Sequence, residues 1–381
     1  MSVSNNNSFE KINNSNKFNF ENLWNIDFRT NYYFKNTEKI KIELTVNDLI
    51  HNKDLIGIHH KIEFKQCHYY ADDMKKYIRL CDNPNFLMLW KPRDISWKLG
   101  KGYISKSRPI NSENNILLLL YHIRHYPEQQ IKLACNDKIP FKNKIKTAVW
   151  RGAITGFENV AIRSKFNLET NIWDNDKLKY NDIKEFVVNK NIPSRFNLVN
   201  KYYQSPIVNV GFTNGPNYMI KYIGDYRYKI KNRLRPEYLL RYKYLISIEG
   251  NDVASNLKWL FASKCLILMP KPTCETWFCE GLLEPWVHYI PLENNLADLY
   301  EKINWCENNT KFCEQIIENQ RVYFAIMYDK QLNNKITKSI LKKYYENVEF
   351  IIKRADMENL NDKQKNIISS FLRYDNVKLE E

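Results

Sequence analysis

A strand, a polar turn, a helix and a second strand follow one another near the middle of the chain, and this order constrains its fold more than any other feature. Tyr244–Ile248 and Cys265–Met269 are short apolar runs, which is typical of strands buried on both faces. Residues 249–252, Glu-Gly-Asn-Asp, have the composition of a turn, and apolar residues within 257–261 recur at helical spacing. This unit predicts an α/β fold with a parallel sheet.

The turn of this unit is the expected ligand site. In open α/β sheets, ligands bind where the carboxyl ends of strands meet the amino ends of helices. Glu249, Asn251 and Asp252 lie in the turn. Asp252 or Ser255 is expected to cap the helix that follows.

Length and composition indicate a globular protein of two domains. The 381 residues are enough for a full core, and the contents of 44% hydrophobic and 14% aromatic residues exclude a disordered chain. No apolar run approaches the ~20 residues that span a bilayer, and no signal sequence is recognisable. The eight cysteines form no CxxC pair, which favours free thiols in a reducing compartment. We therefore expect a soluble, cytoplasmic protein.

The net charge of +15, from 58 basic and 43 acidic residues, favours polyanionic partners. Nucleotide phosphates, nucleic acid, an anionic glycolipid and a membrane surface all satisfy this charge. Because the basic residues are spread along the chain, nucleic acid is not expected as a partner. Peripheral contact with a membrane stays open.

Two other segments carry candidate site residues. Residues 151–156, Arg-Gly-Ala-Ile-Thr-Gly, follow a short strand; glycines there let backbone N–H groups approach an anion, and Arg151 can grip a phosphate. Residues 91–94, Lys-Pro-Arg-Asp, follow the apolar run Phe86–Trp90, where catalytic groups gather in α/β sheets. A solvated charged turn is the alternative for this second segment.

An ordered set of short motifs extends over about residues 100–325. The motifs are Lys106-Ser-Arg-Pro-Ile110, Asn136-Asp-Lys-Ile-Pro-Phe141, Trp150-Arg-Gly152, Val210-Gly211, Glu249-Gly-Asn-Asp-Val-Ala-Ser-Asn-Leu-Lys-Trp259, Met269-Pro-Lys-Pro272, Glu275-Thr-Trp-Phe278, Glu280-Gly281 and His288-Tyr289. In this order they resemble glycosyltransferase family 90. The resemblance is closest to the lipopolysaccharide-core branch of bacteria and large DNA viruses.

The resemblance implies a GT-B-like α/β fold, with two Rossmann-like domains facing a cleft. Residues 1–20, rich in Asn and Ser, are expected to be a disordered tail. The resemblance then implies an acceptor domain at 21–145, a nucleotide-sugar-binding domain at 146–334 and C-terminal helices at 335–381 that pack back across the cleft.

The resemblance also implies a metal-independent enzyme. No cofactor is expected beyond the nucleotide-sugar co-substrate, for which a UDP-sugar is the expected form. Asp174-Asn-Asp176 matches the Asp-x-Asp manganese motif of the other main glycosyltransferase fold, but no apolar strand leads into it. We interpret it as a solvated charged turn.

The resemblance assigns a group of residues to the diphosphate of the donor. They are Arg151, Gly152, Arg195 and the amino end of the helix that starts near Ser255, with Lys258 nearby. In eukaryotic relatives an arginine stands where this chain has Asn256, which shifts the expected phosphate contact to Arg151 and Arg195. Without a metal, such cations must neutralise the leaving group.

The remaining roles concern the sugar and the base. Glu275 is expected at the ribose hydroxyls, while Glu249 and Asp252 either orient the sugar or only shape the turn. Inversion at the anomeric carbon needs a base that deprotonates the acceptor hydroxyl. Asp94 resembles the family's base, although the proline that follows it in relatives is missing, and Asp137 is the second candidate.

The function implied is an inverting transfer of a hexose or pentose from a nucleotide sugar to a glycan or glycolipid, such as a lipopolysaccharide-like core. The alternative is a catalytically inactive scaffold of the same fold that binds glycan or nucleotide.

Overall fold

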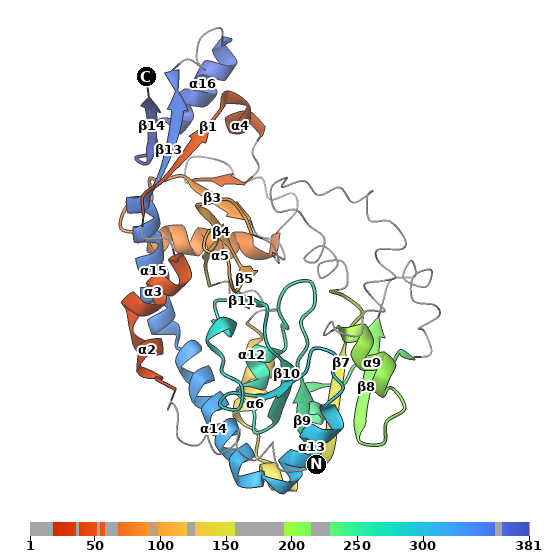
Figure 1. Ribbon diagram of the computed structural model, residues 1–381. Coiled ribbons are helices and arrows are strands. Elements are labelled where there is room, and N and C mark those ends of the chain that lie inside the picture. The colour runs from red at the N-terminus through yellow and green to blue at the C-terminus, as the bar shows by residue number, and fades with distance from the viewer. Residues whose placement is uncertain are drawn as a thin grey trace, which may run out of the picture.

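The computed structural model describes residues 18–35, 38–51, 54–57, 68–91, 95, 98–119, 126–156, 194–214, 229–354 and 360–380. Helices and strands alternate along these residues, and most strand pairs are parallel (Figure 1). The predicted α/β class is therefore confirmed.

The helices of the first half are α2 (Glu21–Trp24), α3 (Ile26–Phe34), α4 (Val46–His51), α5 (His68–Leu80), α6 (Glu128–Cys135) and the 3-10 turn η1 (Phe141–Asn143). Those of the second half are α9 (Arg195–Tyr202), α11 (Pro236–Leu239), α12 (Leu257–Leu260), η4 (Glu280–Leu282), α13 (Leu299–Asn308), α14 (Thr310–Met327), α15 (Lys330–Asn347) and α16 (Asp362–Phe371). None of the described helices combines the length and the apolar character needed to cross a lipid bilayer.

A five-stranded parallel sheet forms the centre of the second half of the chain. Its strands, in the order β12-β10-β9-β7-β8, are Ile290–Leu292, Leu266–Pro270, Tyr242–Ile246, Ile145–Ala153 and Val208–Asn214. Successive residues of β7 enter different hydrophobic clusters, Ala148 with residues of α9 and α13 and Val149 with residues of α6 and α12. The sheet is thus buried on both faces, as the apolar runs that became β9 and β10 predicted.

A second sheet, in the order β2-β3-β4-β6, lies in the first half of the chain. Its strands are Leu55–Ile56, Met88–Lys91, Tyr103–Ser105 and Ile116–Leu117. The neighbours of β4 are parallel to it, and β2 is antiparallel to β3. β3 is the strand predicted from the apolar run before Asp94.

The third sheet joins the two ends of the described chain. β13 (Val348–Lys353) lies between β1 (Ile40–Leu44) and β14 (Val377–Glu380), and all of its pairs are parallel. Residues 335–381, where helices were expected, contain most of α15 and all of α16, and in addition the strands β13 and β14, which the sequence analysis did not predict. The helix itself packs against α3 and α5 of the first half.

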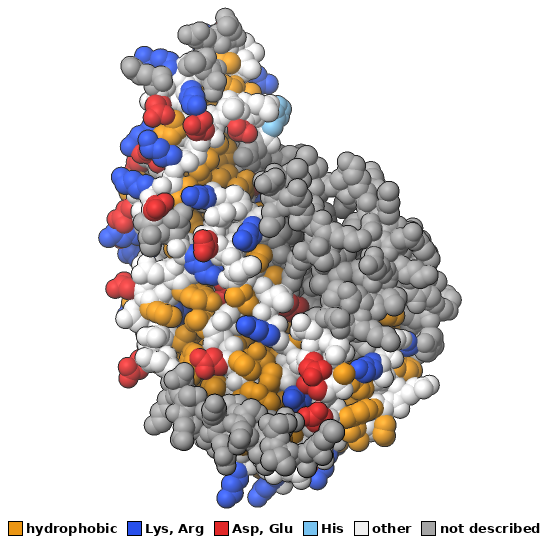
Figure 2. All heavy atoms as spheres, in the orientation of Figure 1, with side chains coloured by type: hydrophobic (Ala, Val, Ile, Leu, Met, Phe, Trp, Pro, Cys, Tyr) orange, Lys and Arg blue, Asp and Glu red, His pale blue; other side chains and the backbone are white. Residues whose placement is uncertain are grey.

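The outer face of this third sheet carries paired charges. Lys353 lies 2.8 Å from Glu43, and Lys378 pairs with Glu349. Basic and acidic side chains are also interspersed over this region in the space-filling view (Figure 2). The excess positive charge is therefore not gathered into one continuous patch on the face shown.

A short antiparallel ladder connects the two halves of the molecule. β5 (Ser107–Pro109) pairs with β11 (Cys274–Thr276), although the strands are far apart in sequence. One hydrophobic cluster runs from Leu23 to Val377 and includes one face of the five-stranded sheet. The two halves therefore share a continuous core.

Candidate functional site

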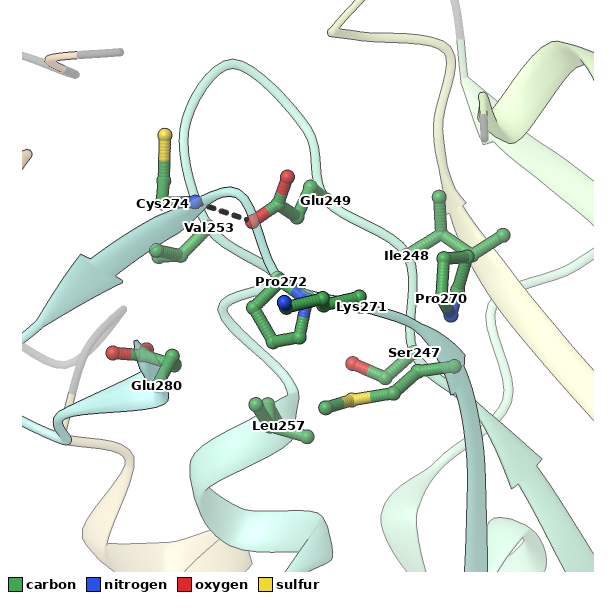
Figure 3. A pocket seen from close by; sticks show the side chains of 12 residues that line it. Ser247, Ile248, Glu249, Val253, Leu257, Pro270, Lys271, Pro272, Cys274 and Glu280 are labelled. Atoms are coloured by element: carbon green, nitrogen blue, oxygen red, sulfur yellow. Dashed lines mark hydrogen bonds between the residues drawn. The ribbon is translucent and has the colours of Figure 1, made fainter. Parts of the chain in front are cut away.

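A pocket open to solvent lies where β9 and β10 end (Figure 3). The space between its walls, together with the open solvent at its mouth, amounts to about 380 Å³. Its walls are formed by Ser247, Ile248, Glu249, Val253, Ala254, Leu257, Met269, Pro270, Lys271, Pro272, Cys274 and Glu280. Most of these side chains are apolar, and the position is the carboxyl end of parallel strands, where the sequence predicted a ligand site.

The carboxylate of Glu249 holds the opposite wall of the pocket in place. One of its oxygens accepts the backbone N–H groups of Thr273 and Cys274, both at 2.9 Å, and the other accepts the Thr273 hydroxyl. Figure 3 shows the bond to Cys274 bridging the turn and the segment after β10. Glu249 thus holds the turn against the segment after β10.

Lys258 does not reach the pocket as a free cation. Its ammonium is fully buried and lies 2.9 Å from Glu280 Oε1. The other oxygen of Glu280 accepts the Thr276 N–H at 2.6 Å. The predicted neighbour of the diphosphate is therefore neutralised beneath the pocket wall.

Lys271 is a pocket cation to which the sequence analysis gave no role. It is exposed, stands between Pro270 and Pro272, and extends over the pocket in Figure 3. Within the described part of the chain, its ammonium makes no hydrogen bond or ion pair. The Met269–Pro272 motif was noticed, but only the fold shows that its lysine faces the same pocket as the turn at 249–252.

The helix after the turn is shorter than predicted. α12 has four residues, Leu257–Leu260, and its N-cap is Asn256, whose side chain makes no capping hydrogen bond. The prediction that Asp252 or Ser255 caps it is wrong. Ser255 is exposed, and the Asn256 carboxamide accepts the Ser247 hydroxyl at 3.2 Å instead. A helix of one turn contributes little dipole to an anion.

Arg195 packs against the back of the turn. Its guanidinium donates to Thr155 Oγ1 at 2.7 Å, to Ala153 O at 3.2 Å and to Ile248 O at 3.3 Å. A Cβ atom on Gly250 would lie 2.7 Å from Arg195 Nη2, so only glycine allows this approach.

The segments on either side of this contact are fixed to each other. Gly156 has a φ of +95°, and a Cβ atom there would lie 2.6 Å from the carbonyl oxygen of Gly250. Its N–H donates to Asn251 Oδ1 at 3.2 Å. Asn251 therefore positions the backbone of the 151–156 loop.

Arg195 is a largely buried cation without a carboxylate partner. Among the described residues, no acidic oxygen lies within 4 Å of it, and its hydrogen-bond acceptors are neutral oxygens. Burial lowers the pKa of Arg195 to about 10, against the opposing effect of the Asp252 and Glu249 charges. The guanidinium remains protonated at neutral pH and has charge left to offer an anion.

Two residues from the first half of the chain bind the carboxylate of Asp252. Its Oδ2 atom lies 2.9 Å from Lys106 Nζ and accepts the Ser107 hydroxyl at 2.8 Å. Burial opposes its ionisation, but Lys106, Ser107 and the Val253 N–H outweigh burial and hold the pKa of Asp252 below its usual range. Its carboxylate shapes the turn rather than facing solvent.

Arg151 and Arg195 do not meet. Arg195 lies 5.8 Å from the ring of Trp150, and alternation along β7 sends Arg151 to the opposite face of the sheet. There Arg151 donates to Asn209 O and Oδ1, both at 2.8 Å. Lys231 donates to the same Oδ1 at 3.1 Å. The two arginines predicted to share the diphosphate thus occupy separate environments.

Gly152 and Glu275 are both tightly enclosed. A Cβ atom on Gly152 would lie 2.5 Å from the Trp150 ring. The fully buried Glu275 carboxylate lies 2.8 Å from Arg108 Nε and 3.4 Å from Lys35 Nζ, and it accepts the Tyr32 hydroxyl. Both of its oxygens are engaged, so its expected contact with a ribose stays a prediction.

The candidate bases differ in what the structure shows of them. Asp94 and the Asp174-Asn-Asp176 motif lie outside the described residues. Ile95, which follows Asp94, donates its N–H to Ser107 Oγ at 3.1 Å, the hydroxyl that contacts Asp252. Asp137, in contrast, is buried in a 2.7 Å ion pair with Lys144 and also accepts the Ile139 N–H.

Comparison with known proteins adds to this geometry. Residues 119–357 match the model of the family described as "Glycosyl transferase family 90". The O-glucosyltransferase LpsA of Dichelobacter nodosus is 31% identical over 245 residues, 63% of this chain and 61% of LpsA.

Two further relatives match different lengths of the chain. Uncharacterized protein 179R of Invertebrate iridescent virus 6 is 26% identical over 76% of this chain and 24% of the viral protein. Human protein O-glucosyltransferase 3 is 34% identical over 20% of this chain and 15% of its own. The chain thus spans less than two thirds of the length of each of these relatives.

Proposed function

We propose, from the premise that this chain belongs to glycosyl transferase family 90, that it transfers a sugar from a UDP-sugar to a hydroxyl of a glycan or glycolipid. LpsA and human protein O-glucosyltransferase 3 carry O-glucosyltransferase in their names, which makes glucose the first sugar to test. A lipopolysaccharide-like core is the acceptor we propose, in keeping with the positive net charge of the chain. A cytoplasmic location, with membrane contact when the acceptor is a glycolipid, is part of this proposal.

The observation that carries the proposal is the charge distribution around the pocket. The carboxylates of Glu249 and Glu280 are engaged by protein donors, while Lys271 in the pocket and Arg195 behind the turn have no acidic partner among the described residues. A departing nucleoside diphosphate concentrates negative charge, and positioned cations stabilise it in place of a metal. The apolar walls suit the base of the nucleotide.

This reading changes the roles given to individual residues. We assign the diphosphate to Arg195 and Lys271, and we assign Asn251 and Asp252 to the shape of the turn. Arg151, on the other face of β7, keeps a donor role only if its side chain leaves Asn209. We keep Asp94 as the proposed base.

The GT-B-like arrangement and the inverting mechanism belong to the same proposal. The five-stranded sheet would form the donor domain at 146–334, and the β2-β3-β4-β6 sheet the acceptor domain at 21–145. The β5–β11 ladder supports this arrangement, because it brings a segment of the first half to the donor side. An acceptor held by the first half would then face the anomeric carbon from the side opposite the diphosphate.

A panel of UDP-sugars, read by UDP release with and without a lipopolysaccharide-core acceptor, tests the proposal. We expect acceptor-dependent release with one donor and an inverted anomeric configuration in the product by NMR. UDP binding without release for any donor would favour the alternative, a nucleotide-binding scaffold that does not turn over.

A further inference from the structure

We propose that Lys106 acts as a positioning residue for the donor site: by holding the carboxylate of Asp252, it keeps Arg195 available for the donor's diphosphate. This inference rests on the proposed function, in which Arg195 faces that diphosphate. It concerns a residue of the first half of the chain that lines no part of the pocket.

Asp252 and Arg195 belong to the same corner of the structure. Arg195 donates to Ile248 O and lies against Gly250, which precedes Asp252 by two residues. The charge of Asp252 is also the main influence opposing the effect of burial on Arg195. Asp252 is thus the natural counter-charge for this guanidinium, yet no ion pair forms between them.

Lys106 supplies the reason. Its ammonium and the Ser107 hydroxyl both bind Asp252 Oδ2, at 2.9 and 2.8 Å. The side chains of Lys106 and Asp252 are 3% and 7% exposed, so little water weakens the pair. Within the described part of the chain, Arg195 is left with neutral acceptors, from Ala153, Thr155 and Ile248.

Removing Lys106 would leave Asp252 as a buried carboxylate for which Arg195 is the remaining cation of that corner among the described residues. A buried charge that loses its partner is costly, and pairing with a neighbouring cation relieves that cost. An Arg195–Asp252 pair would then compete with any anion that Arg195 binds. A neutral residue at position 252 would remove the competitor.

Four proteins test this inference by calorimetric titration with UDP, inorganic pyrophosphate and uridine: wild type, Lys106→Met, Asp252→Asn and the double variant. We expect Lys106→Met to lose about tenfold in affinity for UDP and pyrophosphate, the scale of one charged hydrogen bond. Uridine, which has no phosphate, should bind unchanged. The double variant should regain most of the wild-type affinity.

Lys144→Met is the matched control. Lys144 forms an equally buried 2.7 Å ion pair with Asp137, but neither residue contacts the turn or Arg195. We expect it to lower the melting temperature while folded protein binds UDP as the wild type does. A general loss of stability is thereby separated from a loss of free charge on Arg195.

The outcomes are distinguishable. Wild-type affinity in folded Lys106→Met, or a double variant that binds no better than Lys106→Met, would overturn the inference alone. If Lys106→Met does not fold, the double variant decides: it keeps UDP affinity if the inference holds and loses it if Lys106 or Asp252 touches the phosphates. Wild-type protein that binds neither UDP nor pyrophosphate would end the proposed function together with the inference.

Discussion

Unlike Lys258 and Lys106, Lys271 has no acidic partner among the residues that the structure describes. Lys258 is paired with Glu280, and Lys106 with Asp252, whereas Lys271 projects into the pocket from between two prolines. We predict that Lys271→Ala weakens UDP binding by about tenfold and leaves uridine binding unchanged, because the lost interaction is with phosphate. Titration calorimetry with the two ligands measures the difference. Lys142→Ala, an exposed lysine on η1, is the control, and an equal loss for UDP in both variants would contradict the role.

His288 gives the chain a pH-dependent stability at the scale of one residue. Burial lowers its pKa to about 3, because the fully buried ring has no water to stabilise its charged form, and this outweighs the opposing effect of the backbone hydrogen bond with Glu284. In the unfolded chain the His288 ring binds a proton near pH 6.5. The contribution of His288 to the free energy of unfolding is therefore complete above that pH and is lost as the pH falls toward 3. Between pH 6.5 and 5 this amounts to about 2 kcal/mol. Urea unfolding of wild type and His288→Gln over this range should show the steeper loss in the wild type.

At the level of elements, the β5–β11 ladder depends on one buried charge cluster. Glu275 on β11 binds Arg108 on β5, together with Lys35 and Tyr32 from the end of α3. We predict that Glu275→Gln lowers the free energy of unfolding by about 3–5 kcal/mol, because Arg108 is left as a buried cation without its carboxylate. Equilibrium denaturation measures this loss. Glu346→Gln, which alters an exposed ion pair on α15, should cost less than about 1 kcal/mol, and equal losses would refute the argument.

The elements that could be predicted from the sequence are those with a local pattern. The strands β9 and β10 lie within two residues of the predicted runs. The start of α12 was missed because Asp252, one of the two expected caps, is held by Lys106 and Ser107 from a distant part of the chain. β13 was missed because its apolar residues continue the pattern of α15 and its partner strand, β1, lies some three hundred positions earlier in the chain.

The candidate site, like the fold, could be predicted from the sequence only where a local pattern marks it. The position of the pocket at the carboxyl ends of β9 and β10 follows from a local pattern and a general rule of α/β sheets. The charges that remain free could not be predicted from a local pattern. They depend on pairs such as Lys106–Asp252 and Arg108–Glu275, which join segments far apart in the sequence. Arg151 and Arg195 are equivalent as residue types, so the sequence analysis assigned both the same role. In the structure Arg195 packs near Trp150 on one face of β7, whereas Arg151 points to the other face.

At the scale of the whole molecule, the first half of the chain contacts the proposed donor turn through Lys106 and Ser107, and Ile95 is linked to the same turn through Ser107. The Ile95 N–H donates to Ser107 Oγ at 3.1 Å, and that hydroxyl donates to Asp252 in the turn at 2.8 Å. The backbone next to Asp94 is therefore one hydrogen-bonded residue away from the donor turn. In the function we propose, a base at Asp94 acts on the acceptor while Arg195 and Lys271 hold the diphosphate.

The variant Asp94→Asn separates catalysis of transfer from binding of the nucleotide. We predict that it lowers kcat for transfer by about 10²–10⁴-fold, the usual contribution of a general base, while UDP affinity stays within twofold of wild type. Initial rates of UDP release and calorimetric titration of UDP measure the two quantities on the same preparation. The control is Asp48→Asn, which changes a half-buried carboxylate in the first turn of α4 and should alter neither quantity. Transfer that survives Asp94→Asn would place the base elsewhere. A loss of UDP affinity would place Asp94 at the donor, and the two halves of the chain would then not have the separate roles of activating the acceptor and binding the donor.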